Sequence, residues 1–215
     1  MVKASGQDRD KDTEQRILDA AHAIFIRRGT AGARMQEIAE EAGVNKALLH
    51  YYFRSKEKLA EAVFRRAARE LFPAVIEVLT SDVELDEKVR RVVDVELTQL
   101  LKRPYLPAYI LSEINQEPDR VSQFLSALVG ITPDKIRPRV MTRIRAQIAE
   151  RVDAGTMAPI TAEDFLFNLL SMCIFPFAAR PLFSAIAGFD EKGFTRFIQR
   201  RRTELPQFFF RALRP

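Results

Sequence analysis

The stretch MQEIAEEAGVNKALLHYYFRSKEK, at positions 35–58, constrains the fold of this chain more than any other segment. Its first half places Ile38 and Ala42 four residues apart, which is the spacing of apolar positions on one face of a helix. Its second half repeats that spacing with Leu49 and Phe53. The pattern therefore predicts two short amphipathic helices that follow each other closely.

The residues between these two helices are typical of a tight turn. Gly43 tolerates the positive φ that a sharp helix–helix turn needs, and Ala39 is small enough to let two helices cross closely. Asn45 is placed to cap the second helix by accepting a bond from its free N–H groups. This is the layout of a helix-turn-helix, whose second helix lies in the major groove of DNA. On spacing alone, an ordinary helical hairpin remains an equal alternative.

Cations and aromatic rings crowd the second helix and its exit. These residues are Lys46, His50, Tyr51, Tyr52, Arg54, Lys56 and Lys58. Cations and tyrosine hydroxyls are the groups that hold DNA phosphates. Ser55 is placed to cap the next helix, whose amino end would then point toward a phosphate. This composition favours DNA binding over a plain hairpin.

Residues 13–59 resemble the DNA-binding domain of tetracycline-repressor-type (TetR family) transcriptional regulators. The residues that carry the resemblance are Ile17, Ala20, Ala21, Phe25, Gly29, Ile38, Ala39, Ala42, Gly43, Val44, Leu49, Tyr51, Phe53, Ser55, Lys56, Glu57 and Leu59. The resemblance implies an all-α chain with an N-terminal three-helix head and a C-terminal helical body for dimerisation and ligand binding. We expect the head at residues 1–59, with residues 1–12 disordered, and the body at residues 60–215.

The rest of the chain predicts helices and no strands, because apolar residues recur at helical spacing and no alternation with period two persists. Prolines and glycines punctuate these helices. The expected segments are a helix from Ser55 to about Pro73, one over residues 84–102, a short one after Pro107, one from Pro118 to Gly130, one from Pro133 to Ala154, an apolar stretch at 161–187 interrupted by Pro176 and Pro181, and a last helix at about 190–212 bent near Pro206.

The DNA contacts are expected at the two ends of the second helix. The start of that helix faces the bases, so the predicted base-reading residues are Asn45, Lys46, Ala47 and Leu48. The exit faces the backbone, and the predicted phosphate contacts are His50, Tyr51, Tyr52, Ser55 and Lys56. Leu48 and Ala47 read bases only through apolar contact, so water or DNA shape is expected to supply part of the specificity.

A homodimer is expected because one helix-turn-helix reads few base pairs, whereas two heads related by a two-fold axis read a palindrome. The segment around residues 165–177 is apolar on nearly every side, so one side can face the core and the other a second subunit. The predicted interface residues are Phe167, Ile174, Phe175, Phe194, Phe197 and Ile198. The alternative is that these side chains only fill the core of one monomer.

The family resemblance further implies an effector site inside the body, whose ligand changes the distance between the two heads. The abundance of Phe and Met favours a small, largely apolar ligand. The candidate lining residues are Leu100, Tyr105, Tyr109, Glu113, Phe124, Phe165, Asn168, Met172 and Cys173. A body controlled by a protein partner, or with no small-molecule effector, is the alternative.

Catalysis, metal binding and cofactors find little support in a chain with two histidines, one cysteine and eight glycines. His22 is expected on a helix surface, and Glu113 with Glu117 on a solvated helix face rather than as a catalytic pair. A helical enzyme is therefore a remote alternative.

The polar N-terminus and the lack of an apolar run of roughly 18–20 residues predict a cytoplasmic protein without a membrane span. The expected function is a dimeric, sequence-specific repressor released from a palindromic operator by its ligand.

Overall fold

The computed structural model describes residues 6–71, 73–116 and 133–215, and within these ranges every regular element is a helix. This confirms the predicted all-α class. The elements are α1 (Gly6–Gly32), α2 (Met35–Ala42), α3 (Lys46–Tyr52), α4 (Lys56–Leu71), α5 (Pro73–Thr80), α6 (Leu85–Lys102), α7 (Leu106–Gln116), α9 (Pro133–Asp153), α10 (Ala162–Ala178), α11 (Arg180–Ala187) and α12 (Glu191–Ala212).

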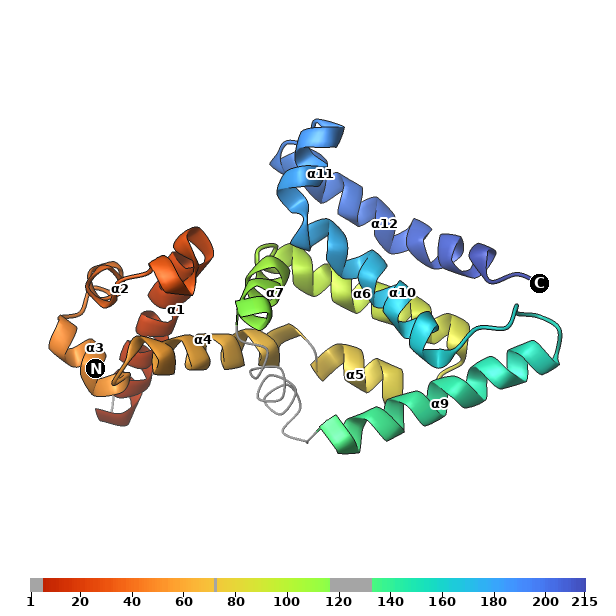
Figure 1. Ribbon diagram of the computed structural model, residues 1–215, viewed down its shortest axis with the longest axis horizontal. Helices are drawn as coiled ribbons and strands as arrows, with labels where there is room; N and C mark the ends of the chain where they lie inside the picture. Colours follow the sequence, from red (N-terminus) through yellow and green to blue (C-terminus); the bar gives the residue numbers. More distant parts are fainter. Residues whose placement is uncertain (1–5, 72, 117–132) are drawn as a thin grey trace, which may run out of the picture.

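Helices α1 to α3 form one end of the molecule, and α4 runs from them toward the remaining helices (Figure 1). Their shared core is made of apolar residues that recur every three or four positions. Its members are fully or almost fully buried: Ile17, Ala21, Ile24, Phe25, Ile38, Ala39, Leu49 and Leu59. The expected domain boundary between residues 59 and 60 falls within α4, which continues from the head into the body without a break.

The beginning of α1 differs from the prediction. Residues 6–12 belong to this helix, so the expected disorder is wrong for them, whereas residues 1–5 lie outside the described part. The extra turns are held in place because the Tyr52 hydroxyl donates a hydrogen bond to Asp10 Oδ1 at 2.7 Å. Near its other end α1 breaks at Gly29, whose φ of 69° and ψ of 160° are not helical.

Helix α6 is the central helix of the body. Its apolar face is completely buried at Val89, Val92, Val93, Leu97 and Leu100. Helix α12 lies along one side of α6, while α5 and α9 lie on the opposite side (Figure 1). Helix α10 packs against α6, α7 and α9 and completes this core.

Prolines act as predicted at three places and differently at one. Pro73 begins α5, which the sequence did not predict as a separate helix, and Pro181 stands in the first turn of α11. Pro206 lies inside α12, where the sequence predicted a helix that continues past it. Pro176, however, lies inside α10 instead of interrupting it. The helix expected between residues 118 and 130 lies outside the described residues.

No single helix of the described residues is long and apolar enough to span a membrane. Helices α10 and α11, which meet at a bend of 75°, would pass that test as a pair by length and composition only.

Candidate nucleic-acid interface

The turn between α2 and α3 has the geometry that Gly43 predicts. Gly43 adopts a left-handed conformation, with φ 64° and ψ 36°. Its N–H donates to Glu40 O at 3.1 Å, and the Val44 N–H donates to Ala39 O at 2.9 Å. These two bonds satisfy carbonyls at the end of α2 that would otherwise have no partner, as in a Schellman motif.

Arg16 of α1 closes this turn from outside. Its Nη2 donates to Ala42 O at 2.6 Å and to Gly43 O at 3.2 Å. The positive guanidinium therefore stands at the carboxyl end of α2, where the helix dipole favours a cation. The sequence does not reveal this role, because an arginine on an amphipathic helix shows no pattern that distinguishes a solvated side chain from one bound to a distant carbonyl.

Helix α3 presents the predicted base-reading residues to solvent. Asn45 caps the helix, since its Oδ1 accepts from the Leu48 N–H at 2.7 Å, as predicted from the sequence. The Nδ2 amino group is then the part of this side chain left to reach a base. Lys46, Ala47 and Leu48 are all exposed. Leu49, completely buried, fixes the opposite face of the helix to the head core.

The exit from α3 divides the predicted phosphate contacts into two groups. His50 and Tyr51 are exposed, Tyr51 to 75%, and the His50 Nδ1 lies 3.4 Å from Arg54 O. Ser55 caps α4, because its Oγ accepts from the Lys58 N–H at 3.3 Å.

The other two side chains are engaged within the protein. Tyr52 donates to Asp10, and Lys56 Nζ donates to Ala31 O at 3.0 Å and to Ala33 O at 3.4 Å. In this structure Lys56 therefore ties the start of α4 to the segment between α1 and α2. Any phosphate contact by Tyr52 or Lys56 has to compete with these internal bonds.

Leu48→Ala tests base reading by the exposed leucine of α3. We expect it to lower affinity for a selected, preferred duplex by about fivefold, since an apolar contact with a base is lost, and to leave affinity for a random duplex unchanged. Competitive binding of the two duplexes, followed by fluorescence anisotropy, measures the ratio. Arg54→Ala is the control and should weaken both duplexes alike. A uniform loss with Leu48→Ala would count against base reading.

Helix α7 joins the body to the head through Tyr109. The Tyr109 ring lies edge-on to His22 with centroids 6.0 Å apart, and it stacks on Phe25 at 6.5 Å. Phe64 of α4 approaches the same ring at 6.5 Å. The prediction that His22 lies on a helix surface is therefore wrong. Burial, reinforced by nearby Arg66, lowers the pKa of His22 to about 4.

Glu113, one turn further along α7, is also in a place that the sequence did not predict. It is only 2% exposed, so the expected solvated helix face is wrong at this position. Its Oε1 accepts from the Thr30 hydroxyl of α1 at 2.5 Å. Glu117, the expected neighbour of Glu113, lies outside the described residues.

The residues predicted to line an effector site differ in their exposure. Those buried in the body core are Leu100, Tyr109, Glu113, Phe165 and Cys173. Met172 is half-buried, Asn168 is exposed, Tyr105 is 51% exposed and Phe124 lies outside the described residues.

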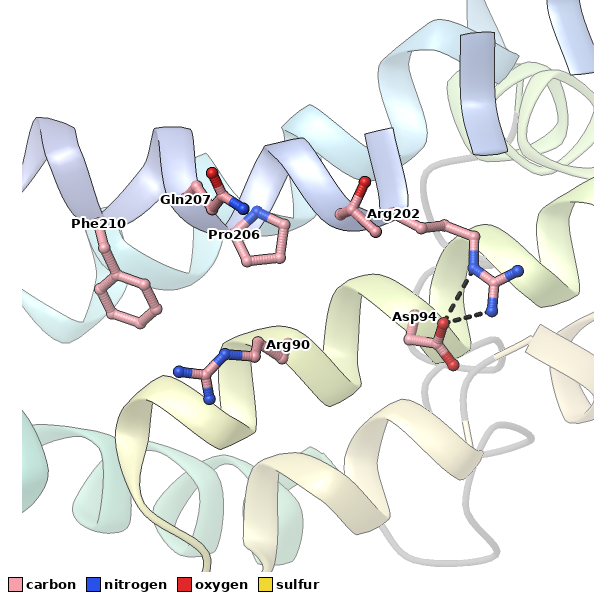
Figure 2. A pocket seen from close by; sticks show the side chains of 7 residues that line it. Arg90, Asp94, Arg202, Pro206, Gln207 and Phe210 are labelled. Atoms are coloured by element: carbon pink, nitrogen blue, oxygen red, sulfur yellow. Dashed lines mark hydrogen bonds and ion pairs between the residues drawn. The ribbon is translucent and has the colours of Figure 1, made fainter. Parts of the chain in front are cut away.

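Two clefts of the body lie elsewhere. One, of about 390 Å³, lies between α6 and α12 and is lined by Arg90, Asp94, Arg202, Thr203, Pro206, Gln207 and Phe210 (Figure 2). There the Arg202 guanidinium pairs with Asp94 across the cleft. The other, of about 440 Å³, lies between α9 and the start of α10. Neither cleft is lined by any residue predicted for the effector site.

Buried Glu96, which no sequence pattern pointed to, lies near Cys173 in the body core. Glu96 of α6 is 1% exposed, and its Oε2 is buried without a hydrogen-bond partner. Burial raises the pKa of Glu96 to about 7 and that of Cys173 to about 12. Arg201 of α12 is close enough to act electrostatically on Cys173, and its Nη2 donates to Met172 O at 2.9 Å. No group of three or more potential metal ligands occurs among the residues that the structure covers.

The predicted dimer residues separate into exposed and buried ones. Phe167 is 70% exposed and Phe175 is 55% exposed, both on α10. Phe194 and Ile198 of α12 are buried within the chain, at 2% and 0% exposure, so the prediction that they face a partner is wrong. The Phe194 ring packs edge-on against Phe177 instead, at 5.4 Å. Ile174 and Phe197 are half-buried.

Comparison with known proteins agrees with this geometry. Residues 17–63 match the sequence profile of the family described as "Bacterial regulatory proteins, tetR family". The HTH-type transcriptional regulator BetI of Rhizobium meliloti is 30% identical over 148 residues, which cover 67% of this chain and 72% of that protein. An uncharacterised HTH-type transcriptional regulator of Mycobacterium tuberculosis is 31% identical over 126 residues. That match covers 57% of this chain and 62%, less than two thirds, of the relative.

Solved structures extend the likeness to the whole described fold. A TetR family transcription regulator from Marinobacter aquaeolei superposes with a TM-score of 0.59 at 18% identity, covering 96% of this chain and 98% of the other. HlyIIR, a haemolysin II transcriptional regulator, superposes with a TM-score of 0.58 at 25% identity, covering 95% and 98%. The relatives matched by sequence are named transcriptional regulators, which sets aside the alternative of a helical enzyme. The chain therefore belongs to the tetR family of bacterial regulatory proteins.

Proposed function

We propose that this regulator is a homodimeric repressor that binds a palindromic operator and is released by a small, largely apolar ligand. The observation that carries the proposal is the exposed start of α3, where Leu48 is 36% exposed and Asn45 caps the helix. In this proposal residues 1–59 bind DNA, and residues 60–215 supply dimerisation and effector binding. Repression is the mode expected from the family resemblance, and contact with chromosomal DNA would place the protein in the bacterial cytoplasm.

An exposed apolar face on the body supports the dimer. Phe167 and Phe175 lie two turns apart on α10, and the Phe175 ring packs edge-on against Phe183 of α11 at 5.7 Å. Leu182 and Ile186 of α11 are 57% and 77% exposed. Large apolar side chains gathered on one face are typical of a protein interface. A second copy of the chain would bury them and bring two heads to the same duplex.

The contacts of α7 support control by a ligand. A ligand in the body can change head spacing only if it binds one arrangement better than the other. Because Tyr109 and Glu113 contact α1, a shift of α7 would be felt directly by the head. A second candidate is control by a partner protein, which would bind Leu182 and Ile186 in place of the second copy of the chain.

Footprinting with selected duplexes tests the dimer and the operator together. We expect protection of two half-sites about one helical turn apart, and a dimer in light scattering. Phe175→Glu should give monomers and lose the palindromic footprint, whereas Leu111→Glu, which changes an exposed apolar residue of α7, should do neither. A wild-type monomer with a single half-site footprint would contradict the proposal. Release of bound DNA by members of an apolar ligand library would then separate ligand control from partner control.

A further inference from the structure

The turns at the start of α1 bring an acidic side chain to the exit of the recognition helix. Tyr52 is the last residue of α3, and its hydroxyl donates to Asp10 Oδ1 at 2.7 Å. The two residues are 42 positions apart in the chain, so the contact is a product of the fold. The bond to Asp10 is the main cause of the raised pKa of Tyr52.

The same hydroxyl stands where the DNA backbone is expected. Tyr51, whose ring lies edge-on to Tyr52 with centroids 5.4 Å apart, is 75% exposed. His50 and Arg54 are exposed beside it. A tyrosine hydroxyl among such groups is a natural donor to a phosphate oxygen. In this structure the Tyr52 hydroxyl donates instead to the carboxylate of Asp10, which is an anionic acceptor like a phosphate.

We propose that Asp10 is an internal competitor of DNA phosphate, which holds the Tyr52 hydroxyl and lowers the affinity of the head for any duplex. The inference rests on the proposed contact between the exit of α3 and the DNA backbone. Two effects act together. The hydroxyl must leave Asp10 before it can bind phosphate, and the Asp10 charge repels phosphates that lie within the Debye length of about 10 Å at moderate salt.

Three variants at Asp10 and Asp12 separate the effect of the charge from the effect of the hydrogen bond. Asp12 is exposed on the same helix, but two positions along a helix point to nearly opposite sides. Asp12→Ala therefore removes the same charge without freeing Tyr52. Asp10→Asn removes the charge but keeps an oxygen that accepts from the hydroxyl. Asp10→Ala removes both the charge and the acceptor.

The test is binding of each variant to a labelled duplex of random sequence at low salt. We expect Asp10→Ala to bind about tenfold more tightly than the wild type, because the loss of a charge and the release of a donor add. Asp10→Asn and Asp12→Ala should each gain only about twofold. In a Tyr52→Phe background, Asp10→Ala should gain no more than Asp12→Ala does. Thermal unfolding confirms that each variant is folded.

Three outcomes would overturn the proposal. Equal gains for Asp10→Ala and Asp12→Ala would mean that only net charge matters. A large gain that persists in the Tyr52→Phe background would show that the hydroxyl plays no part. A loss of affinity with Asp10→Ala would mean that Asp10 supports the binding conformation. A wild-type protein that binds no duplex contradicts the proposed function itself and is thereby distinguished from these three results.

Discussion

Replacing Glu96 by leucine is expected to raise the free energy of unfolding at pH 8 by about 3 kcal/mol. The carboxyl group is almost completely buried among α6, α10 and α12, and burial raises its pKa from 4.5 to about 7. Between these two values the folded protein keeps a proton that the unfolded chain has released. The stability contributed by this group is therefore fully present below pH 4.5 and is lost as the pH rises through 7.

Urea unfolding near pH 5 and pH 8 measures this effect. The advantage of Glu96→Leu over the wild type should be larger at the higher pH by about 2 kcal/mol. Glu204→Leu, which changes an exposed carboxylate of α12, is the control and should show no such pH dependence. An advantage that is equal at both pH values would mean that Glu96 is ionised or paired in the folded protein.

Gly43→Val is expected to destabilise the head by about 2 kcal/mol or more and to abolish detectable DNA binding. The φ of 64° strains any residue with a Cβ, and a β-branched one most of all. A Cβ at this position would also lie 3.1 Å from Arg16 Nη2, so the clamp on the turn would have to move. The recognition helix would then be presented at a wrong angle.

Gly155 provides a matched control for this change. Its φ is 65°, at the end of α9, and a Cβ there would meet nothing within 4 Å. Gly155→Val should cost a similar backbone strain and leave DNA affinity unchanged. Thermal unfolding and duplex binding compare the two variants. DNA binding by Gly43→Val at wild-type strength would show that the turn does not orient α3.

Local signals account for what the sequence predicted well. Gly43, Asn45 and Ser55 each act on a backbone group within five residues of themselves, so their roles follow from short-range rules. The apolar spacing of α2 and α3 likewise identified buried faces correctly. The N-terminal turns were misjudged because what holds them, the bond from Tyr52 to Asp10, joins distant segments.

Long-range contacts explain the other misses. Arg16 and Glu113 look like ordinary charged residues of helix surfaces, and only the fold brings each one to its partner. The predictions for the aromatic residues of α10 and α12 were incomplete for a different reason. Helix α10 is apolar on most sides and so gives no indication of which side meets the core, which made exposed Phe175 and buried Phe177 indistinguishable. The amphipathic α12 has one apolar face, and its pattern does not tell whether that face, with Phe194, meets the core or a partner.

The clamp that Arg16 makes on the α2–α3 turn limits how this regulator can be controlled. Helix α1 is bonded to the turn, α4 is bonded to the α1–α2 segment through Lys56, and Asp19 of α1 pairs with Arg66 of α4 at 2.9 Å. These contacts tie α3 to the rest of the head, so we expect α3 to move with the whole head and not separately. In the proposed dimer, an effector would then adjust the position of one head relative to the other rather than the shape of the reading surface.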